Sequence, residues 1–195
     1  MMAKQDIPEV YGLIGAMNVF DPEMAQHLIA TATFAERVAT VMALDSETIE
    51  NCRVGAILHD IGRLGIDKSI LECPAMLVEA EWDVLTDHPM LGARLLKTIP
   101  ALAHIAPIVR AHHERIDGSG YPDALIGDEI PIEARIIAVA DAFHTMTMPH
   151  AYRFASATTT AMAELVGNSD SQFDADVVEA FGVMIGVRRR RLHHA

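Results

Sequence analysis

Residues 59–71 read HDIGRLGIDKSIL, and they follow a stretch that has the hydrophobic spacing of a helix. Four residues in this stretch recur at steps of three and four, as the residues of one helix face do. The pattern ends in His59-Asp60, so an imidazole and a carboxylate close an apolar helix face. The repeating positions are Ile49, Cys52, Ala56 and His59.

The same helical periodicity extends along most of the chain. Asp21 and Pro22 are a cap and a first-turn residue for a helix over 22–44, and Asp45 caps the next helix. The segment 117–131 is rich in Gly, Pro and Asp and predicts a long loop. No strand pattern or internal repeat is evident, so the sequence predicts an all-α fold, a single compact helical bundle. Further helices are expected over 79–88 (ended by Pro89), 101–114, 131–147, 156–166 and 174–186 (capped by Asp174).

The charge of the chain limits its partners. Its 195 residues carry 15 Lys and Arg against 27 Asp and Glu, a formal net charge of −12. This charge argues against binding to DNA or to an anionic membrane, although local cations or metals can still hold a small anionic substrate. No apolar run reaches the roughly 18 residues of a membrane span, and the first residues lack a signal-peptide core. A cytoplasmic location is therefore expected.

The ends of the chain differ in composition from its middle. We expect a helical extension over 1–20, the main domain over 21–186 and a basic tail over 187–195. The tail is either a solvated end or an anchor for an acidic partner or a nucleic acid. Cys52 and Cys73 are too few for a disulfide framework or a zinc cluster, and small buried apolar residues are the simpler interpretation. The apolar fraction of 51% favours a homodimer.

Histidines and aspartates recur on otherwise apolar helices. A single one of these histidines is more often a hydrogen-bonded core residue, but Asp141 follows five apolar residues and cannot be solvated easily. Burial of a carboxylate without a partner costs several kcal/mol. A metal ion is one such partner, and the two oxygens of Asp60 can bridge two ions. The resulting two-metal set is His59, Asp60, His88, His112, His113 and Asp141.

Four motifs together resemble the HD-GYP family, a branch of the HD superfamily. The family has an all-helical fold with a Gly-Tyr-Pro loop, a centre of two or three metals that are often iron, and phosphodiesterase activity on cyclic di-GMP. These properties are what the resemblance implies for this chain. The motifs are HDIGRLGIDKSIL (59–71), HHERIDGSGYPDALIGDEIP (112–131), ARIIAVADAFHTMT (134–147) and SQFDADVVEAF (171–181).

The resemblance also implies roles for single residues. Asp60 would bridge the metals and, with Arg63, form the catalytic pair. Arg63 and Arg153 would hold the phosphate oxygens, and Gly120 and Tyr121 would shape the mouth of the pocket. The Gly-rich loop would also be the contact surface for a signalling protein. One metal would take Asp60, His88, His112 and His113, and the other an upstream histidine, His59, Asp60 and Asp141.

The upstream histidine has no match in the motif where the family carries it. Matched through Glu36-Arg37-Val38, the ligand position holds Phe34, whose ring is expected to fill the place of the ligand. His27 lies two turns earlier, about 10 Å along the axis, and is expected to be too far away. Ala30 stands where a third metal would need a glutamate.

Three further departures lie near the expected site. Arg63 replaces a lysine and cannot donate a proton near neutral pH. His144 replaces an aspartate and shares a helix face with Asp141, so it can hydrogen-bond that carboxylate or approach the metal. His150-Ala151-Tyr152-Arg153 keeps one of two arginines.

Two functions from different classes follow. The first is a metal-dependent phosphodiesterase for cyclic di-GMP, weakened by the missing ligand. The second is a degenerate domain that binds a nucleotide or a signalling protein without turnover. A general HD-type nucleotide phosphohydrolase is a third and weaker interpretation, since the intact Gly-Tyr-Pro motif argues against it. Imidazole and carboxylate suit two divalent ions, with Fe or Mn preferred and Zn or Ni compatible.

Overall fold

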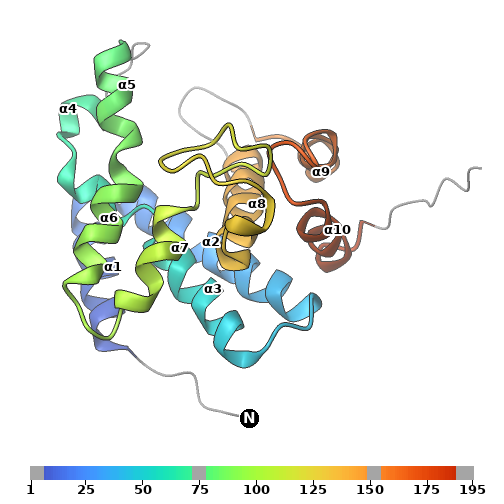
Figure 1. The fold of residues 1–195 in the computed structure, drawn as a ribbon, viewed down its shortest axis with the longest axis horizontal. Coiled ribbons are helices and arrows are strands. Elements are labelled where there is room, and N and C mark those ends of the chain that lie inside the picture. Colours follow the sequence, from blue (N-terminus) through green and yellow to red (C-terminus); the bar gives the residue numbers. More distant parts are fainter. Residues whose placement is uncertain (1–6, 72–77, 149–154, 188–195) are drawn as a thin grey trace, which may run out of the picture.

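The computed structural model describes residues 7–71, 78–148 and 155–187. Within these ranges the chain forms α-helices joined by short 3-10 helices and loops (Figure 1). The α-helices are α1 (Pro8–Phe20), α2 (Pro22–Val41), α3 (Ser46–Leu58), α4 (Lys68–Leu71), α5 (Glu79–Thr86), α6 (His88–Lys97), α7 (Ala106–Arg110), α8 (Ile132–Thr147), α9 (Thr158–Gly167) and α10 (Ala175–Met184). The 3-10 helices are η1 (Ile61–Gly65), η2 (Ala103–Ile105) and η3 (Gly127–Glu129).

Three aspartates begin helices as the sequence predicts. The side chain of Asp21 accepts a hydrogen bond from the backbone N–H of Met24, at 3.0 Å, and starts α2. Asp45 accepts from two backbone N–H groups of α3, and Asp174 does the same for α10. Each carboxylate thus satisfies amides that the helix leaves unpaired.

Two predicted helices differ from the structure. Pro89 does not end a helix over 79–88, because α5 already ends at Thr86 and Pro89 lies in the first turn of α6. Proline is tolerated there because the first-turn N–H groups have no partner inside a helix. The helix expected over 101–114 is shorter, since only η2 and α7 form and a turn follows Arg110.

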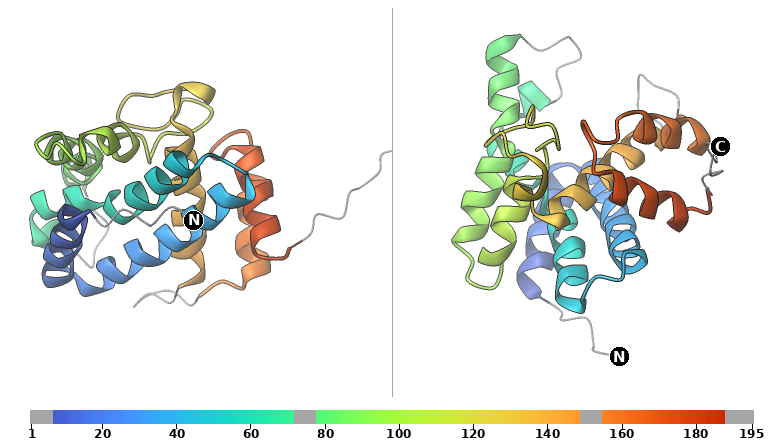
Figure 2. Two further views of the ribbon diagram at one scale, coloured as in Figure 1. Left: turned by 90° about the horizontal axis from the view of Figure 1, so that it is seen from below. Right: turned by 45° about the vertical axis from the view of Figure 1, so that its right-hand side comes forward.

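Helix α8 lies at the centre of the molecule (Figure 1). Helices α2 and α3 pack against it and against each other, and α9 and α10 also contact it. The two further views show α1, α6 and α7 gathered at the end of the bundle away from α9 and α10 (Figure 2). Many of the largest fully buried side chains come from these helices, among them Leu28, Ile136, Ile137 and Phe181.

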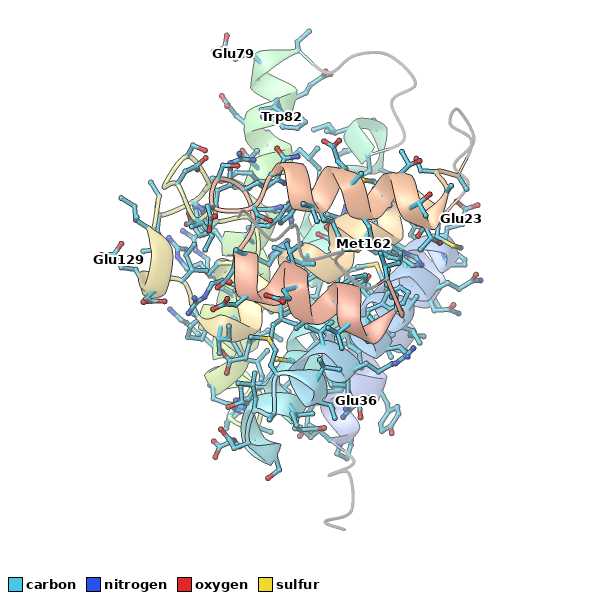
Figure 3. All side chains as sticks on the ribbon, turned by 90° about the vertical axis from the view of Figure 1, so that its right-hand side faces the viewer. Glu23, Glu36, Glu79, Trp82, Glu129 and Met162 are labelled. Atoms are coloured by element: carbon cyan, nitrogen blue, oxygen red, sulfur yellow. The ribbon has the colours of Figure 1, made fainter. Side chains whose placement is uncertain are left out.

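Helices α9 and α10 cover one face of the bundle (Figure 3). Met162 on α9 lies between the two helices and is nearly buried, whereas Trp82 on the projecting helix α5 is 54% exposed. The described residues contain two isolated β-bridges and no strand, which confirms the all-α prediction. None of the described helices has the length and apolar character to span a membrane.

A close approach of backbones positions the His59-Asp60 pair. Gly62 in η1 packs against the start of α6, where a Cβ atom would overlap the carbonyl oxygen of His88. Such an approach requires a residue without a side chain. Because Gly62 is two residues after Asp60, this contact places the Asp60 carboxylate beside the His88 ring.

Candidate metal centre

The structure brings together all six residues that the sequence predicts as metal ligands, and adds a seventh, His27. They form two clusters. Within each cluster every residue offers one nitrogen or oxygen atom, and these atoms all lie within 4.8 Å of one another. The first cluster is Asp60, His88, His112 and His113, and the second cluster is His27, His59 and Asp141.

The first cluster is assembled from three separate segments of the chain. Asp60 lies between α3 and η1, His88 begins α6, and His112 and His113 follow α7. His88 Nε2 is 3.0 Å from Asp60 Oδ1, 3.3 Å from His112 Nε2 and 3.1 Å from His113 Nε2. His88 therefore lies at the centre of the cluster.

Backbone carbonyls fix the orientation of three histidines. Each carbonyl oxygen accepts a hydrogen bond from the Nδ1 atom of the histidine three residues later. The pairs are His59 with Ala56 (2.8 Å), His88 with Leu85 (2.7 Å) and His112 with Val109 (2.6 Å). A carbonyl can only accept, so Nδ1 carries the proton and each neutral ring turns the lone pair of Nε2 toward the site.

These lone pairs point at one another, which is the observation that tests a metal. With both rings neutral, no proton lies between the Nε2 atoms of His88 and His112, which are 3.3 Å apart, and such an arrangement is repulsive unless a cation binds both. Three imidazoles and a carboxylate are a typical set of ligands for Zn, Fe or Mn. The residues of the first cluster therefore fit a divalent metal ion.

The protonation states agree with this role. Burial, and then the nearby charges of His113 and His59, hold the pKa of His112 well below its usual range. Burial lowers the pKa of His113 to about 4. Burial alone would raise the pKa of Asp60, but His59, Arg63 and His88 keep it well below the usual value. The rings of His112 and His113 are thus neutral and Asp60 is ionised at pH 7, as metal binding requires.

The second cluster joins α2, α3 and α8. His27 Nε2 is 2.8 Å from Asp141 Oδ1, and His59 Nε2 is 4.0 Å from the same oxygen. Burial lowers the pKa of His27, but the hydrogen bond and charge of Asp141 outweigh it and raise the pKa overall. Two imidazoles and a carboxylate offer three ligands to a second ion.

Asp60 connects the two clusters. Its Oδ1 faces His88 and His112, at 3.0 and 3.8 Å, whereas its Oδ2 lies 3.9 Å from His59 Nε2. The two oxygens are thus turned to different clusters, which is the arrangement of a bridging carboxylate.

The prediction that Phe34 fills a ligand position is wrong. Its ring packs in the core, with its centre 5.6 Å from that of Phe143 and 5.7 Å from that of Phe181. His27, expected to be too far away, holds the place instead. The reason is geometric: His27 and Phe34 are seven residues apart, so both lie on the face of α2 that meets α8, at different heights.

Because the candidate ligand on α2 is His27 and not Phe34, the residue one turn before it is Glu23 and not Ala30. Glu23 is exposed and belongs to neither cluster. The sequence carries one signal for His27, although the helical pattern does not fix the height of the ligand on α2. His27 is the single histidine between the start of the helix at Asp21 and Pro22 and the next cap at Asp45.

Arg63 lies next to the candidate metal centre and is hydrogen-bonded to one of its residues. Its Nη1 donates to Asp60 Oδ2 at 3.0 Å and contacts the Met24 sulfur at 3.8 Å. Its side chain borders a small hollow of about 50 Å³ beside Lys68. The arginine therefore presents its charge at the edge of the centre, beside the buried Asp60 carboxylate.

A larger cleft of about 290 Å³ opens beside the Gly-Tyr-Pro loop. It is lined by His113, Tyr121 and Asp141, and by Gln172 and Phe173 before α10. The volume approaches the lower limit of typical ligand pockets. Both clusters contribute a residue to its wall, so a bound ligand would contact the candidate metal centre directly.

The Gly-Tyr-Pro loop forms one wall of this cleft. A Cβ atom on Gly120 would lie 2.5 Å from Glu114 Cα and 2.6 Å from His113 O, so the loop passes too close for any side chain. The Tyr121 ring stacks on His113 with centres 4.8 Å apart. Buried Glu114 accepts hydrogen bonds from the backbone N–H groups of Asp123 and Leu125, which ties the loop to the histidine pair. Arg153 lies outside the described residues.

Comparison with known families agrees with this geometry. The family model described as HD domain matches residues 16–177, which include both clusters and the Gly-Tyr-Pro loop. The chain belongs to the HD domain family. The resemblance to its HD-GYP branch, predicted from the four motifs, is confirmed by curated relatives that are named as phosphodiesterases of cyclic dinucleotides.

Two curated relatives carry names that state an activity. The cyclic di-GMP phosphodiesterase response regulator RpfG of Xanthomonas campestris is 38% identical over 159 residues, covering 77% of this chain and 42% of the relative. The 3'3'-cGAMP-specific phosphodiesterase 3 of Vibrio cholerae is 33% identical over 159 residues, covering 82% and 35%. This chain therefore spans less than half the length of these relatives.

Among solved structures, Bd1817, an HDG"Y"P protein from Bdellovibrio bacteriovorus, is similar with a TM-score of 0.65. Its sequence is 17% identical, and the match covers 82% of this chain and 51% of that one. At this identity the similarity supports the fold.

Proposed function

We propose that this chain is a metal-dependent phosphodiesterase that hydrolyses cyclic di-GMP. The observation that carries the proposal is the position of Asp60: its two oxygens face two separate histidine clusters, and His113 and Asp141 of these clusters line an open cleft. Phosphodiester hydrolysis is one of the reactions for which paired metal sites about 3.5–4 Å apart are used. The activities stated in the names of the relatives favour a cyclic dinucleotide as the substrate.

Two divalent ions are proposed, Fe or Mn in preference to Zn or Ni. The first cluster would hold one ion and the second cluster, with Asp60, the other. When bound, such ions lower the pKa of a water molecule and neutralise charge on phosphoryl oxygens.

The chain's own residues supply binding and orientation. Asp60 stays ionised and shares its oxygens between the clusters. Arg63, beside Asp60 Oδ2, holds a nonbridging phosphate oxygen as a permanently charged group and donates no proton. Gly120 and Tyr121 close one side of the cleft, so that a nucleotide whose phosphate lies at Asp60 packs its remainder against the loop.

The alternative, a domain that binds without turnover, was suggested by the apparent loss of a ligand. The position of His27, 2.8 Å from Asp141, supports the phosphodiesterase proposal over that alternative. The division into 1–20, 21–186 and 187–195, the role of Arg153, a signalling partner at the Gly-Tyr-Pro loop and a homodimer stay predictions from the sequence.

The test is an assay of the chain purified without a metal-affinity column. After treatment with a chelator, Mn²⁺ or Fe²⁺ is added and hydrolysis of cyclic di-GMP and of 3'3'-cGAMP is followed by chromatography. We expect hydrolysis that depends on the metal and prefers cyclic di-GMP. The matched control is Asp60→Asn, which keeps the shape of the side chain but not its charge.

Asp60→Asn should lower turnover roughly 1000-fold, since about 4 kcal/mol of transition-state stabilisation is lost. Equal turnover by the wild type and Asp60→Asn would overturn the proposal. Binding of cyclic di-GMP without any turnover would favour the binding domain instead.

A further inference from the structure

His27 differs from the other oriented histidines in its hydrogen-bond partner. His59, His88 and His112 each use a backbone carbonyl three residues earlier, and each lies at a helix end or in a turn. His27 lies inside α2, where the preceding carbonyls already accept hydrogen bonds from the helix backbone. Its ring must therefore be oriented by another element.

That element is α8. The Nδ1 atom of His27 is 2.7 Å from the Nδ1 atom of His144, and its Nε2 atom is 2.8 Å from Asp141 Oδ1. Asp141 and His144 are three residues apart and so share one face of α8. One turn of α8 thus contacts both nitrogens of the His27 ring.

The protons of this pair are constrained by metal binding. A histidine that binds a metal through Nε2 must keep its proton on Nδ1, and that proton needs an acceptor. With a metal on His27 Nε2, the acceptor in the 2.7 Å contact would be the Nδ1 lone pair of His144, whose own proton would then be on Nε2. His144 is 7% exposed and belongs to neither cluster.

We propose that His144 is a positioning residue of the second cluster, which accepts the Nδ1–H of His27 and thereby directs His27 Nε2 at the metal. This inference rests on the proposed function, because it assumes that the second cluster holds an ion. It predicts that loss of the acceptor lowers the affinity of the second cluster for its ion and leaves the affinity of the first cluster unchanged.

Two substitutions of similar shape separate the acceptor from the packing of the ring. In H144N the amide oxygen is attached at the same position as Nδ1 and can accept the hydrogen bond. In H144L a methyl group takes that position and cannot. H104L, which removes an exposed histidine outside both clusters, is the control for nonspecific metal binding.

The measurement is a titration of each chelator-treated protein with Mn²⁺, which gives the number of bound ions and the affinity of each step. We expect two ions in the wild type. H144L should lower the affinity of one step about 10- to 100-fold, the usual effect of losing the hydrogen-bond partner of a metal ligand. H144N and H104L should stay close to the wild type in both steps.

Each other outcome is decisive. Wild-type affinity in H144L, or an equal loss in H144L and H144N, overturns the acceptor role. If the wild type binds fewer than two ions, the two-metal proposal fails before any variant is compared. Thermal unfolding of each apo protein shows whether it is folded, and if H144L is not, H144M replaces it as a flexible apolar side chain.

Discussion

The two clusters of the candidate metal centre are held in different ways. In the first cluster, His88 and His112 lie where a helix begins or has ended, and each is oriented by a carbonyl of its own segment. In the second, His27 lies inside a long helix and is oriented by side chains of α8. The first cluster therefore depends on local turns, whereas the second exists only when α2 and α8 are packed in the correct register.

The largest effect is expected from the first cluster. His88→Gln removes the ring whose Nε2 is within 3.3 Å of two other histidines and 3.0 Å from Asp60. The first ion should be lost and turnover should fall roughly 1000-fold, equivalent to ~4 kcal/mol. Metal analysis and the cyclic di-GMP assay measure both quantities. His104→Gln is the control, and turnover near the wild-type value in His88→Gln would mean that the first cluster is not catalytic.

A smaller effect is expected from the second cluster. His27→Gln should lower turnover about 100-fold and reduce the metal content by one ion per chain, because His59, Asp60 and Asp141 remain as a poorer set of ligands. The first ion should stay bound with wild-type affinity. Metal stoichiometry after dialysis checks this, and two retained ions would show that His27 is not a ligand.

The loop next to the first cluster should affect substrate binding more than metal binding. In Gly120→Ala the new Cβ atom would lie 2.5 Å from Glu114 Cα, so the loop must move away from His113. We expect KM to rise about tenfold, or ~1.4 kcal/mol, with the metal content unchanged. Gly12→Ala is the matched control, since no atom lies within 4 Å of its Cβ. A KM equal to that of the control would exclude a role of the loop in substrate binding.

The smallest effect on activity is expected at Phe34. Phe34→Leu should leave metal content and turnover unchanged and lower the free energy of unfolding by about 1–2 kcal/mol, because contacts with Phe143 and Phe181 are lost. Phe34→His should bind no additional ion. Thermal unfolding and metal analysis decide the matter, and a gain of metal in Phe34→His would restore the register in which Phe34 holds the ligand position.

Much of the fold could be predicted because its signals are local. Asp21, Asp45 and Asp174 begin helices in the structure as they do in the sequence pattern. The prediction for Pro89 is wrong because a proline can either stop one helix or start the next, and the sequence alone does not say which. The helical pattern in the sequence continues past Arg110, but the chain forms a turn there. With this turn, His112 Nε2 lies 3.8 Å from Asp60 Oδ1.

The candidate site could be predicted only in part, for a related reason. The motif residues from His59 to Asp141 carry their own context of turns and apolar neighbours. On a regular helix, however, a slip of seven residues leaves the face unchanged, so the pattern could not distinguish His27 from Phe34. Only the packing of α2 on α8 decides which of the two lies beside Asp141.

Anomalous diffraction from crystals grown with Mn²⁺ tests the central claim most directly, because it locates each ion without reference to activity. The account predicts two peaks on either side of Asp60, one among His88, His112 and His113 and the other bounded by His27, His59 and Asp141. A single peak in the first cluster, with His27 still hydrogen-bonded to Asp141 and no ion beside it, would contradict the account.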